Sequence, residues 1–241
     1  MAVAWIAFAG GVIAALVSAV VALRQSQMAE RLARVSHDLD VEKDRRAALL
    51  DRDLRAEEVL TRYREPLAAA AFDLQSRLYN ILELEFFAKF GDGERSEDAL
   101  ETTLFRLAQY FGWTEILRRD IQFLSFPEAQ DTRRVAKLQA DIARCFLRDD
   151  YADGLMIWSD EQRGLGERMI VADDGRVLCM GYATFRDRDD EVFGRWRKRL
   201  AEAVSRPDSS VRLRDVQHLL CELVETLDSN RVRYTENLQR A

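Results

Sequence analysis

The sequence predicts a mainly α-helical protein with an N-terminal transmembrane helix, a long helical stalk, and a helical-bundle domain that carries a small β-hairpin. Two observations support this fold class. Only 11 Gly and 3 Pro occur in 241 residues, which favours long uninterrupted helices. The chain is also 48% apolar, enough to build a packed core. We therefore expect an anchor at 1–23, a stalk at 24–65 and a domain at 66–241.

A membrane anchor is predicted between Ala2 and Leu23, where 22 consecutive residues carry no charge. At 1.5 Å of rise per residue such a helix is about 33 Å long, and a hydrocarbon core is roughly 30 Å thick. A cleaved signal peptide is the alternative, because residues 19–22 resemble a small-residue cleavage site. However, no Lys or Arg precedes the apolar run, and the run is long for a signal peptide.

The charged flanks of this segment predict its orientation. Arg24, Arg31 and Arg34 follow the segment and no basic side chain precedes it, so we expect the N-terminus outside and the domain in the cytoplasm. Three cysteines, an odd number without framework spacing, also suit a reducing compartment. The chain contains 32 Arg but only 4 Lys, a bias typical of GC-rich bacterial genomes, so the membrane expected is the inner membrane of a bacterium.

Two patterns predict a homo-oligomer. In the anchor, Gly11, Ala15 and Ala19 recur every four residues and would allow two membrane helices to approach closely, although an alanine-rich composition alone can produce such a row. In the stalk the spacing of a coiled-coil seam appears but is interrupted by Glu42 and Arg46, so a true coiled coil is left open. The seam positions are Met28, Leu32, Val35, Leu39, Leu50 and Leu54.

The domain is expected to begin at Pro66, because proline disfavours helical geometry in the residue before it. Apolar residues at helical spacing then predict a core helix at 67–90 that is apolar on much of its circumference. The same reasoning predicts a helix at 96–111 closed by Gly112 and another at 114–124. A capping box with proline in the first turn at 125–128 opens a further helix that ends near Asp149.

The last third of the chain mixes element types. A short helix is predicted at 159–170, opened by a possible cap at Ser159. Asp174-Gly175 between two apolar runs is a type I′ turn signal, which predicts a β-hairpin. Two final helices are expected at 189–205 and 210–230, the second with a leucine-rich inward stripe at Leu213, Val216, Leu220, Leu223 and Leu227.

A candidate ligand pocket lies in the segment 158–169. Two glycines there each cost a helix about 1 kcal/mol relative to alanine, so close packing or a ligand near the backbone should compensate. The pocket residues expected are Trp158, Asp160, Arg163, Gly164 and Glu167. The simpler alternative is a capped helix with ordinary ion pairs between neighbouring turns.

The densest basic run in the chain is a candidate anion-binding patch formed by Arg195, Arg197, Lys198 and Arg199. Trp196 lies within it and shares a helical stripe with Phe193 and Leu200. That spacing favours a buried ring, and basic residues near a helix C-terminus also suit its dipole.

Catalytic and metal-binding motifs are missing from the sequence. It contains no Ser-His-Asp order, P-loop, Cys-x-x-Cys pair or His-Glu-x-x-His, so an enzyme is disfavoured although not excluded. His37 lies in the charged stalk. His218 precedes Cys221, Glu222 and Glu225 at ligand-like offsets, but no matching pair occurs elsewhere, so we expect neither a metal nor a cofactor.

The net charge of -6 offers no global attraction for nucleic acid, which makes a nucleic-acid partner unexpected. The predicted function is therefore that of a single-pass membrane-anchored scaffold or signalling accessory that binds other proteins. A membrane-tethered enzyme or small-ligand sensor using 158–169 is the first alternative. Nucleic-acid or anionic-lipid binding through 195–199 is the second.

Overall fold

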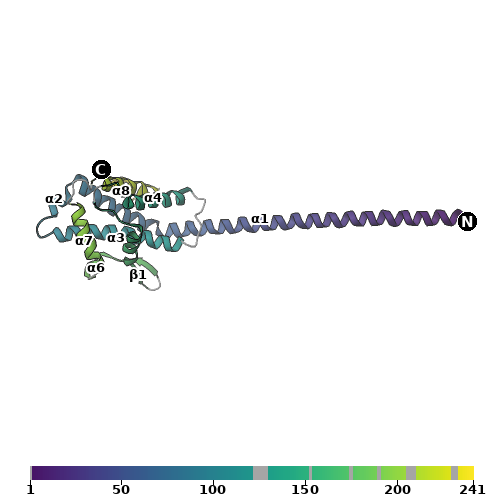
Figure 1. Ribbon diagram of the computed structural model, residues 1–241, viewed down its shortest axis with the longest axis horizontal. Coiled ribbons are helices and arrows are strands. Elements are labelled where there is room, and N and C mark those ends of the chain that lie inside the picture. Colours follow the sequence, from purple (N-terminus) through teal and green to yellow (C-terminus); the bar gives the residue numbers. More distant parts are fainter. Residues whose placement is uncertain are drawn as a thin grey trace. The chain divides into compact units, whose positions relative to one another are not determined.

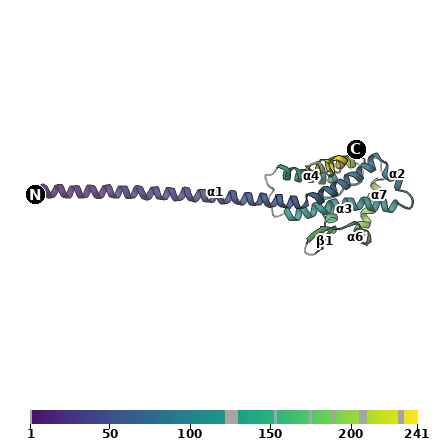
Figure 2. The ribbon, with the colours of Figure 1, turned by 180° about the vertical axis from the view of Figure 1, so that it is seen from behind.

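The computed structural model is mainly α-helical and contains a small antiparallel hairpin, as the sequence predicted (Figures 1 and 2). It describes residues 2–121, 130–151, 154–173, 176–188, 191–204, 210–228 and 233–241. The chain divides into two compact units, 1–51 and 52–241. The second unit begins before Pro66, where the sequence placed the start of the domain.

The first unit is formed by the N-terminal part of helix α1, which spans Ala2–Glu83. Side chains at 2–23 lie outside the described residues, and so do the predicted anchor contacts of Gly11, Ala15 and Ala19. No helix in the described part of the chain has the length and apolarity that a membrane crossing requires. Beyond residue 23, the residues of the predicted seam, Met28, Leu32, Val35, Leu39, Leu50 and Leu54, are each more than half exposed.

Helix α1 continues through Pro66 without ending. Proline removes one backbone donor and normally disfavours a helix interior. Here the residues that follow it, Leu67, Ala68 and Ala71, are buried in the core of the second unit. Tertiary packing of this apolar face therefore outweighs the local cost of the proline.

The predicted single helix at 67–90 is wrong, because the structure breaks it in two. Helix α1 ends at Glu83, and the five-residue helix α2 covers Phe86–Phe90. Between them Glu85 adopts a left-handed backbone with φ 52° and ψ 43°. This conformation is uncommon for a residue with a side chain, and it redirects the chain so that the aromatic residues of α2 fold back beside α1.

The two helices predicted at 96–111 and 114–124 form one continuous helix, α3, which spans Ser96–Ile121. Gly112 does not close a helix; it lies inside α3 at a point of close packing. A Cβ atom at Gly112 would lie 2.8 Å from the Cβ of Met169 and 2.7 Å from the Sγ of Cys179. The glycine therefore lets the hairpin region approach the α3 backbone.

The remaining elements surround α1 and α3. Helices α4 (Gln130–Leu147) and α8 (Ser210–Leu227) pack against each other, and α3 contacts both α5 (Ser159–Arg168) and α7 (Glu191–Val204). The capping box predicted at 125–128 lies outside the described residues. Sequence reasoning did not identify α6 (Tyr182–Asp187) or the 3-10 turn η2 (Thr235–Asn237).

The predicted hairpin is confirmed. Strands β1 (Ile170–Asp173) and β2 (Arg176–Cys179) pair antiparallel, with Ile170 opposite Cys179 and Asp173 opposite Arg176. The two turn residues lie outside the description. The leucine-rich stripe of α8 is also confirmed, because all five of its predicted inward residues are buried. Each fully buried side chain of this kind stabilises the fold by about 1.5–3 kcal/mol.

Candidate functional site

Helix α5 is held at its first turn and along one face by a few polar contacts. Trp158 is extended and precedes the helix, and its backbone N–H donates to the Glu161 carboxylate over 2.8 Å. The buried Gln162 amide donates to the carbonyls of Ala143 and Ile157 at 2.9 and 2.8 Å. Leu165 is buried as well, so one face of α5 is held rigidly and the opposite face is left for solvent or a ligand.

The structure does not gather the predicted residues of 158–169 around one pocket. Trp158 is 59% exposed, and the side chains of Asp160 and Arg163, which lie 3.9 Å apart, point into solvent. Glu167 pairs with Arg119 of α3 over 3.0 Å. Gly164 differs from these, because it lines a pocket between α5 and α7.

This α5–α7 pocket has a volume of about 440 Å³. It joins Gly164 of the first predicted site to two members of the predicted anion patch, Arg195 and Arg199. The full lining consists of Glu161, Gly164, Leu165, Arg168, Val192, Arg195, Trp196 and Arg199. Three arginines against one glutamate give the pocket a formal charge of +2, with an apolar floor of Leu165, Val192 and Trp196.

The arginines of this pocket differ in how firmly they are held. Arg199 donates to the Glu161 carboxylate over 3.0 Å and to the Met156 carbonyl, and its guanidinium lies 4.6 Å from the Trp196 ring centroid. Arg195 is exposed and makes no hydrogen bond or ion pair with any residue that the structure describes. One guanidinium is thus fixed in place and another is available to a ligand.

The predicted basic run is divided between different surroundings. Arg195 and Arg199 are four residues apart and face the pocket, which is the spacing of neighbours on a helix. Arg197 instead lies 3.8 Å from Glu97 of α3, and Lys198 is exposed. Trp196 is buried, as its helical stripe predicted.

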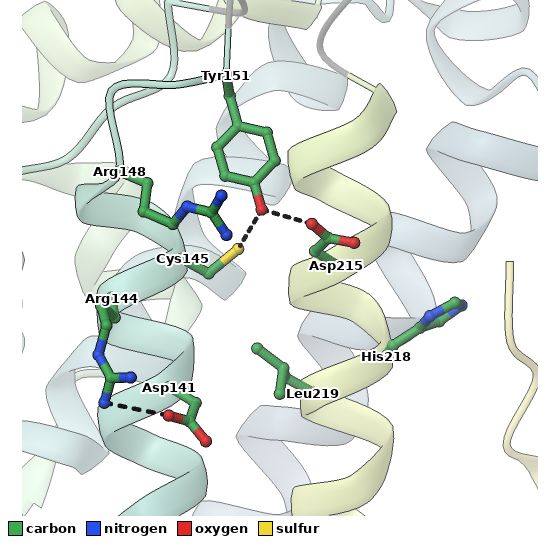
Figure 3. A pocket seen from close by; sticks show the side chains of 8 residues that line it. All are labelled: Asp141, Arg144, Cys145, Arg148, Tyr151, Asp215, His218 and Leu219. Atoms are coloured by element: carbon green, nitrogen blue, oxygen red, sulfur yellow. Dashed lines mark hydrogen bonds and ion pairs between the residues drawn. The ribbon is translucent and has the colours of Figure 1, made fainter.

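A second polar pocket, of about 380 Å³, lies between α4 and α8 and was not identified from the sequence (Figure 3). Tyr151 donates its hydroxyl hydrogen to Asp215 over 2.5 Å, and its oxygen lies 3.6 Å from the Sγ of Cys145. The pocket residues at 141–151 and those on α8 are 64 or more positions apart in the sequence. No local spacing pattern therefore indicates this pocket.

Chemistry at Cys145 and Tyr151 is suppressed by their surroundings. Burial raises the pKa of the Cys145 thiol. Burial and then the hydrogen bond to Asp215 raise the pKa of the Tyr151 hydroxyl. Both groups therefore stay protonated at neutral pH, whereas a cysteine nucleophile needs a lowered pKa. This arrangement is a packing contact between helices rather than a nucleophile with its base.

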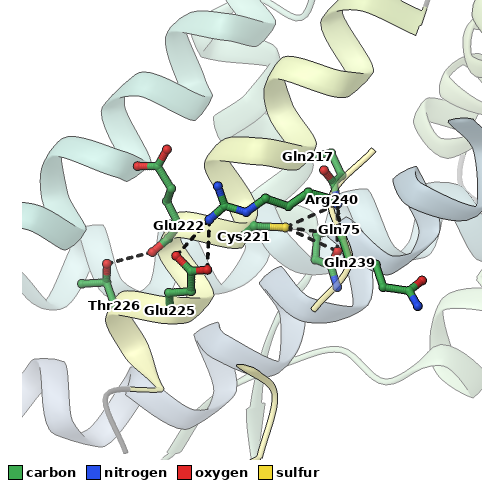
Figure 4. Close-up of polar contacts among 8 residues, drawn as sticks. All are labelled: Gln75, Gln217, Cys221, Glu222, Glu225, Thr226, Gln239 and Arg240. Atoms are coloured by element: carbon green, nitrogen blue, oxygen red, sulfur yellow. Dashed lines mark hydrogen bonds and ion pairs between the residues drawn. The ribbon is translucent and has the colours of Figure 1, made fainter. Parts of the chain in front are cut away.

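The residues that had ligand-like offsets on α8 have different partners, and Figure 4 shows those of Cys221 and Glu225. The thiol of Cys221 is buried, lies 3.6 Å from the Gln75 side-chain oxygen, and has its pKa raised to about 11 by burial. Glu225 pairs with Arg240 at 2.9 Å, and His218 lies 2.6 Å from the Ala241 carbonyl oxygen. Within the described residues no group of three or more His, Cys, Asp or Glu side chains is placed to hold a metal ion.

The α5–α7 pocket is therefore the candidate site, because it places arginine side chains beside apolar ones. Comparison with known proteins adds no relative: no protein family matches the chain, and no curated protein or solved structure shows significant similarity to it.

Proposed function

We propose that this protein is a single-pass, membrane-anchored adaptor whose domain binds an acidic segment of a partner protein in the α5–α7 pocket. The observation that carries the proposal is the convergence of Arg168, Arg195 and Arg199 on one apolar floor. Guanidinium groups bind carboxylates through paired hydrogen bonds, and a preformed apolar floor accepts a side chain next to the acidic one.

The setting of the pocket favours a protein segment as its ligand. Its volume of about 440 Å³ lies within the range of about 300–1,000 Å³ that small-molecule sites show, so the size alone also admits a small ligand. Outside the pocket, the exposed Lys198 extends the positive surface along α7. A peptide can contact this extension as well as the pocket, whereas a small anion reaches only the pocket.

The membrane part of the proposal rests on the sequence. It comprises an uncharged segment at 2–23, basic residues only on its C-terminal side, and therefore a cytoplasmic domain at the inner membrane of a bacterium. The three cysteines are free thiols, which suits a reducing compartment. A reporter fused after Ala241 should be active only if it requires the cytoplasm; activity of a periplasmic reporter there would reverse the proposed topology.

The partner proposal is tested by matched charge reversals on α7. Full-length protein in nanodiscs should capture a partner from cell extract, and Arg195→Glu should weaken that capture at least tenfold, because a cation–carboxylate pair becomes a repulsion. Lys198→Glu makes the same charge change three residues away, on the extension outside the pocket lining, and should weaken capture by a smaller factor, because only the flanking contact of the peptide is lost. A partner captured equally by both variants would contradict the proposal.

The small-ligand alternative uses the same pocket and makes a different prediction. A sensor would bind a low-molecular-weight anion and gain thermal stability from it without a protein partner. A competing polyglutamate peptide distinguishes the adaptor from the sensor. If the protein is an adaptor, the peptide should displace the captured partner; a sensor has no captured partner to displace. The nucleic-acid alternative gains little support, because the basic run is divided between the pocket and Glu97.

A further inference from the structure

Another pocket, of about 210 Å³, lies where α1, α2 and α3 meet. We name it the Arg77 pocket, after the α1 side chain that lines it. Helix α2 contributes two aromatic rings, and the remaining residues come from the start of α3 or immediately precede it. The lining consists of Arg77, Phe86, Phe90, Arg95, Asp98, Ala99 and Thr102.

Arg77 is buried and has no ion-pair partner among the residues that the structure describes. Its side chain is only 7% exposed, and its Nη2 donates to the Thr102 hydroxyl over 3.3 Å. Its Nε and Nη1 are buried and have no hydrogen-bond partner among the residues described. The Phe86 ring centroid lies 3.8 Å from Cζ, so an aromatic face covers the guanidinium plane. Hydrogen bonds to a guanidinium form in its plane, which leaves those donors available to an acceptor.

Nearby groups do not neutralise this charge. The Asp98 carboxylate lies 3.4 Å from Arg186, which already pairs with it. The Thr102 hydroxyl donates to the Asp98 carbonyl, so it serves Arg77 only as an acceptor. Burial, and then repulsion from Arg106, lower the pKa of Arg77 to about 10. A buried cation of this kind is costly unless an anion accompanies it.

We propose that the Arg77 pocket binds a small monocarboxylate, whose carboxylate pairs with Arg77 and whose apolar body lies against Phe86 and Phe90. Phe90 is 42% exposed and presents the apolar surface that such a body would cover. The small volume selects a ligand with a short chain or a single ring. Because Nε and Nη1 of Arg77 are buried, we expect the carboxylate to reach them through a small shift of α2, a helix of only five residues that is joined to α1 through the left-handed Glu85.

The first test uses the unaltered full-length protein in nanodiscs, with benzoate as the probe and benzamide as its neutral analogue. Benzoate at about ten times a Kd of about 1 mM should raise the melting temperature by about 3 °C. Benzamide has nearly the same shape and should bind at least tenfold more weakly, because it lacks the charge. Equal effects of the two compounds, or no effect of benzoate, would overturn the proposal.

The second test places the binding at Arg77. Arg77→Gln should abolish the preference for benzoate over benzamide. Arg106→Gln, also next to the pocket but not in its lining, should retain it, and so should Arg195→Gln in the α5–α7 pocket. Loss of the preference in Arg195→Gln with retention in Arg77→Gln would assign the binding to the other pocket and refute this one. The outcome is independent of whether the adaptor proposal holds, because partner capture is not measured.

Discussion

Arg212 is fully buried and completes the end of a neighbouring helix. Its guanidinium donates to the carbonyls of Cys145 and Phe146 in the last turn of α4, and of Arg148 just after it, at 2.7, 3.0 and 2.9 Å; the Phe146 carbonyl also accepts the backbone N–H of Ile157 over 2.9 Å. We expect Arg212→Met to lower the free energy of unfolding by about 3 kcal/mol or more, because three buried carbonyls lose a charged donor. Urea unfolding followed by circular dichroism measures this.

The matched control for Arg212 is Arg214, two residues further along α8. Its guanidinium lies 3.3 Å from Glu83, and both side chains are about 40% exposed. Arg214→Met should change the free energy of unfolding by less than about 1 kcal/mol, as exposed ion pairs usually do. Similar losses in the two variants would show that the buried contacts of Arg212 do not carry the stability ascribed to them.

Gly164 and Gly166 give opposite predictions although they are two residues apart. A Cβ at Gly164 meets nothing within 4 Å, whereas one at Gly166 would lie 2.5 Å from the Phe111 carbonyl oxygen. Gly164→Ala should therefore keep or raise stability, by up to about 1 kcal/mol, through better helix propensity. Gly166→Ala should cost roughly 1–3 kcal/mol through overpacking. Thermal unfolding of both variants checks this, and a destabilised Gly164→Ala would contradict it.

The sequence predicted which apolar residues are buried but not which charged residues are. Hydrophobic spacing identified Leu213, Val216 and Leu220 as core, and they are buried. It placed no charged residue in the core, yet Arg77 and Arg212 are buried. Their partners lie on other helices, and helical periodicity within one segment carries no information about those partners.

Among the elements, the turn η2 after α8 is held in part by the Asp228 carboxylate, which accepts several hydrogen bonds. Asp228 accepts hydrogen bonds from the backbone N–H groups of Tyr234 and Thr235 at 2.9 and 3.0 Å, and from the Thr235 hydroxyl at 2.9 Å. Burial alone would raise the pKa of Asp228. The hydrogen bonds outweigh burial and lower the pKa to about 2.

This shift predicts how stability depends on pH. The pKa of Asp228 in the folded protein is below the value of about 3.9 in an unfolded chain, so the ionised form stabilises the fold above about pH 4. That stability is lost as the pH falls toward 2. Asp228→Asn should cost about 1–2 kcal/mol at pH 7 and almost nothing near pH 2. Urea unfolding across this range measures the difference, with Asp92→Asn, at an exposed loop carboxylate, as the control. If the loss of unfolding free energy in Asp228→Asn did not change with pH, the lowered pKa would not belong to Asp228.

Elements with local signals were predicted better than those defined by contacts. The hairpin and the helices α7 and α8 have clear turn or stripe patterns, and they occur where the sequence placed them. The break before α2 depends on the backbone of Glu85, a residue type that carries no turn signal. The continuity of α3 depends on packing at Gly112, and a glycine at a helix end gives the same sequence signal as one at a close contact.

For the molecule as a whole, we predict self-association through residues outside the domain. The small-residue row in the anchor and the exposed apolar seam of the stalk favour a parallel pair of helices. Substituting Gly11 and Ala15 by Ile should reduce crosslinked dimer severalfold in membranes, because bulky side chains separate the helix backbones. Crosslinking yield on denaturing gels measures this.

The control for self-association changes the opposite side of the same segment. Ile13→Leu preserves volume, Val17→Leu adds one methylene group, and both positions lie off the small-residue row, so the double variant should leave the dimer unchanged. Equal crosslinking in both double variants would mean that the row arises from an alanine-rich composition and forms no interface.

The candidate site could be predicted only in part. The sequence singled out two separate segments, 158–169 and 195–199, each for its own local composition. The structure brings Gly164 of the first segment together with Arg195 and Arg199 of the second. Composition identifies unusual segments, but the packing of α5 and α7 decides which of their residues face one another. That packing depends on contacts with α3, which no single segment encodes.

The contacts of Arg212 also bear on the order in which this chain can complete its fold during synthesis. Three carbonyls at and just after the end of α4 receive a charged donor from a residue encoded 64 to 67 positions later. A ribosome that has released α4 but not yet α8 therefore carries a helix whose last turn is unfinished and whose apolar face is bare. Proteins this long fold through partly structured intermediates, and such an intermediate exposes surface that can aggregate. The nascent domain must then wait for α8 to emerge, and a pause in translation shortly before Ser210 would lengthen the time for which it depends on chaperones.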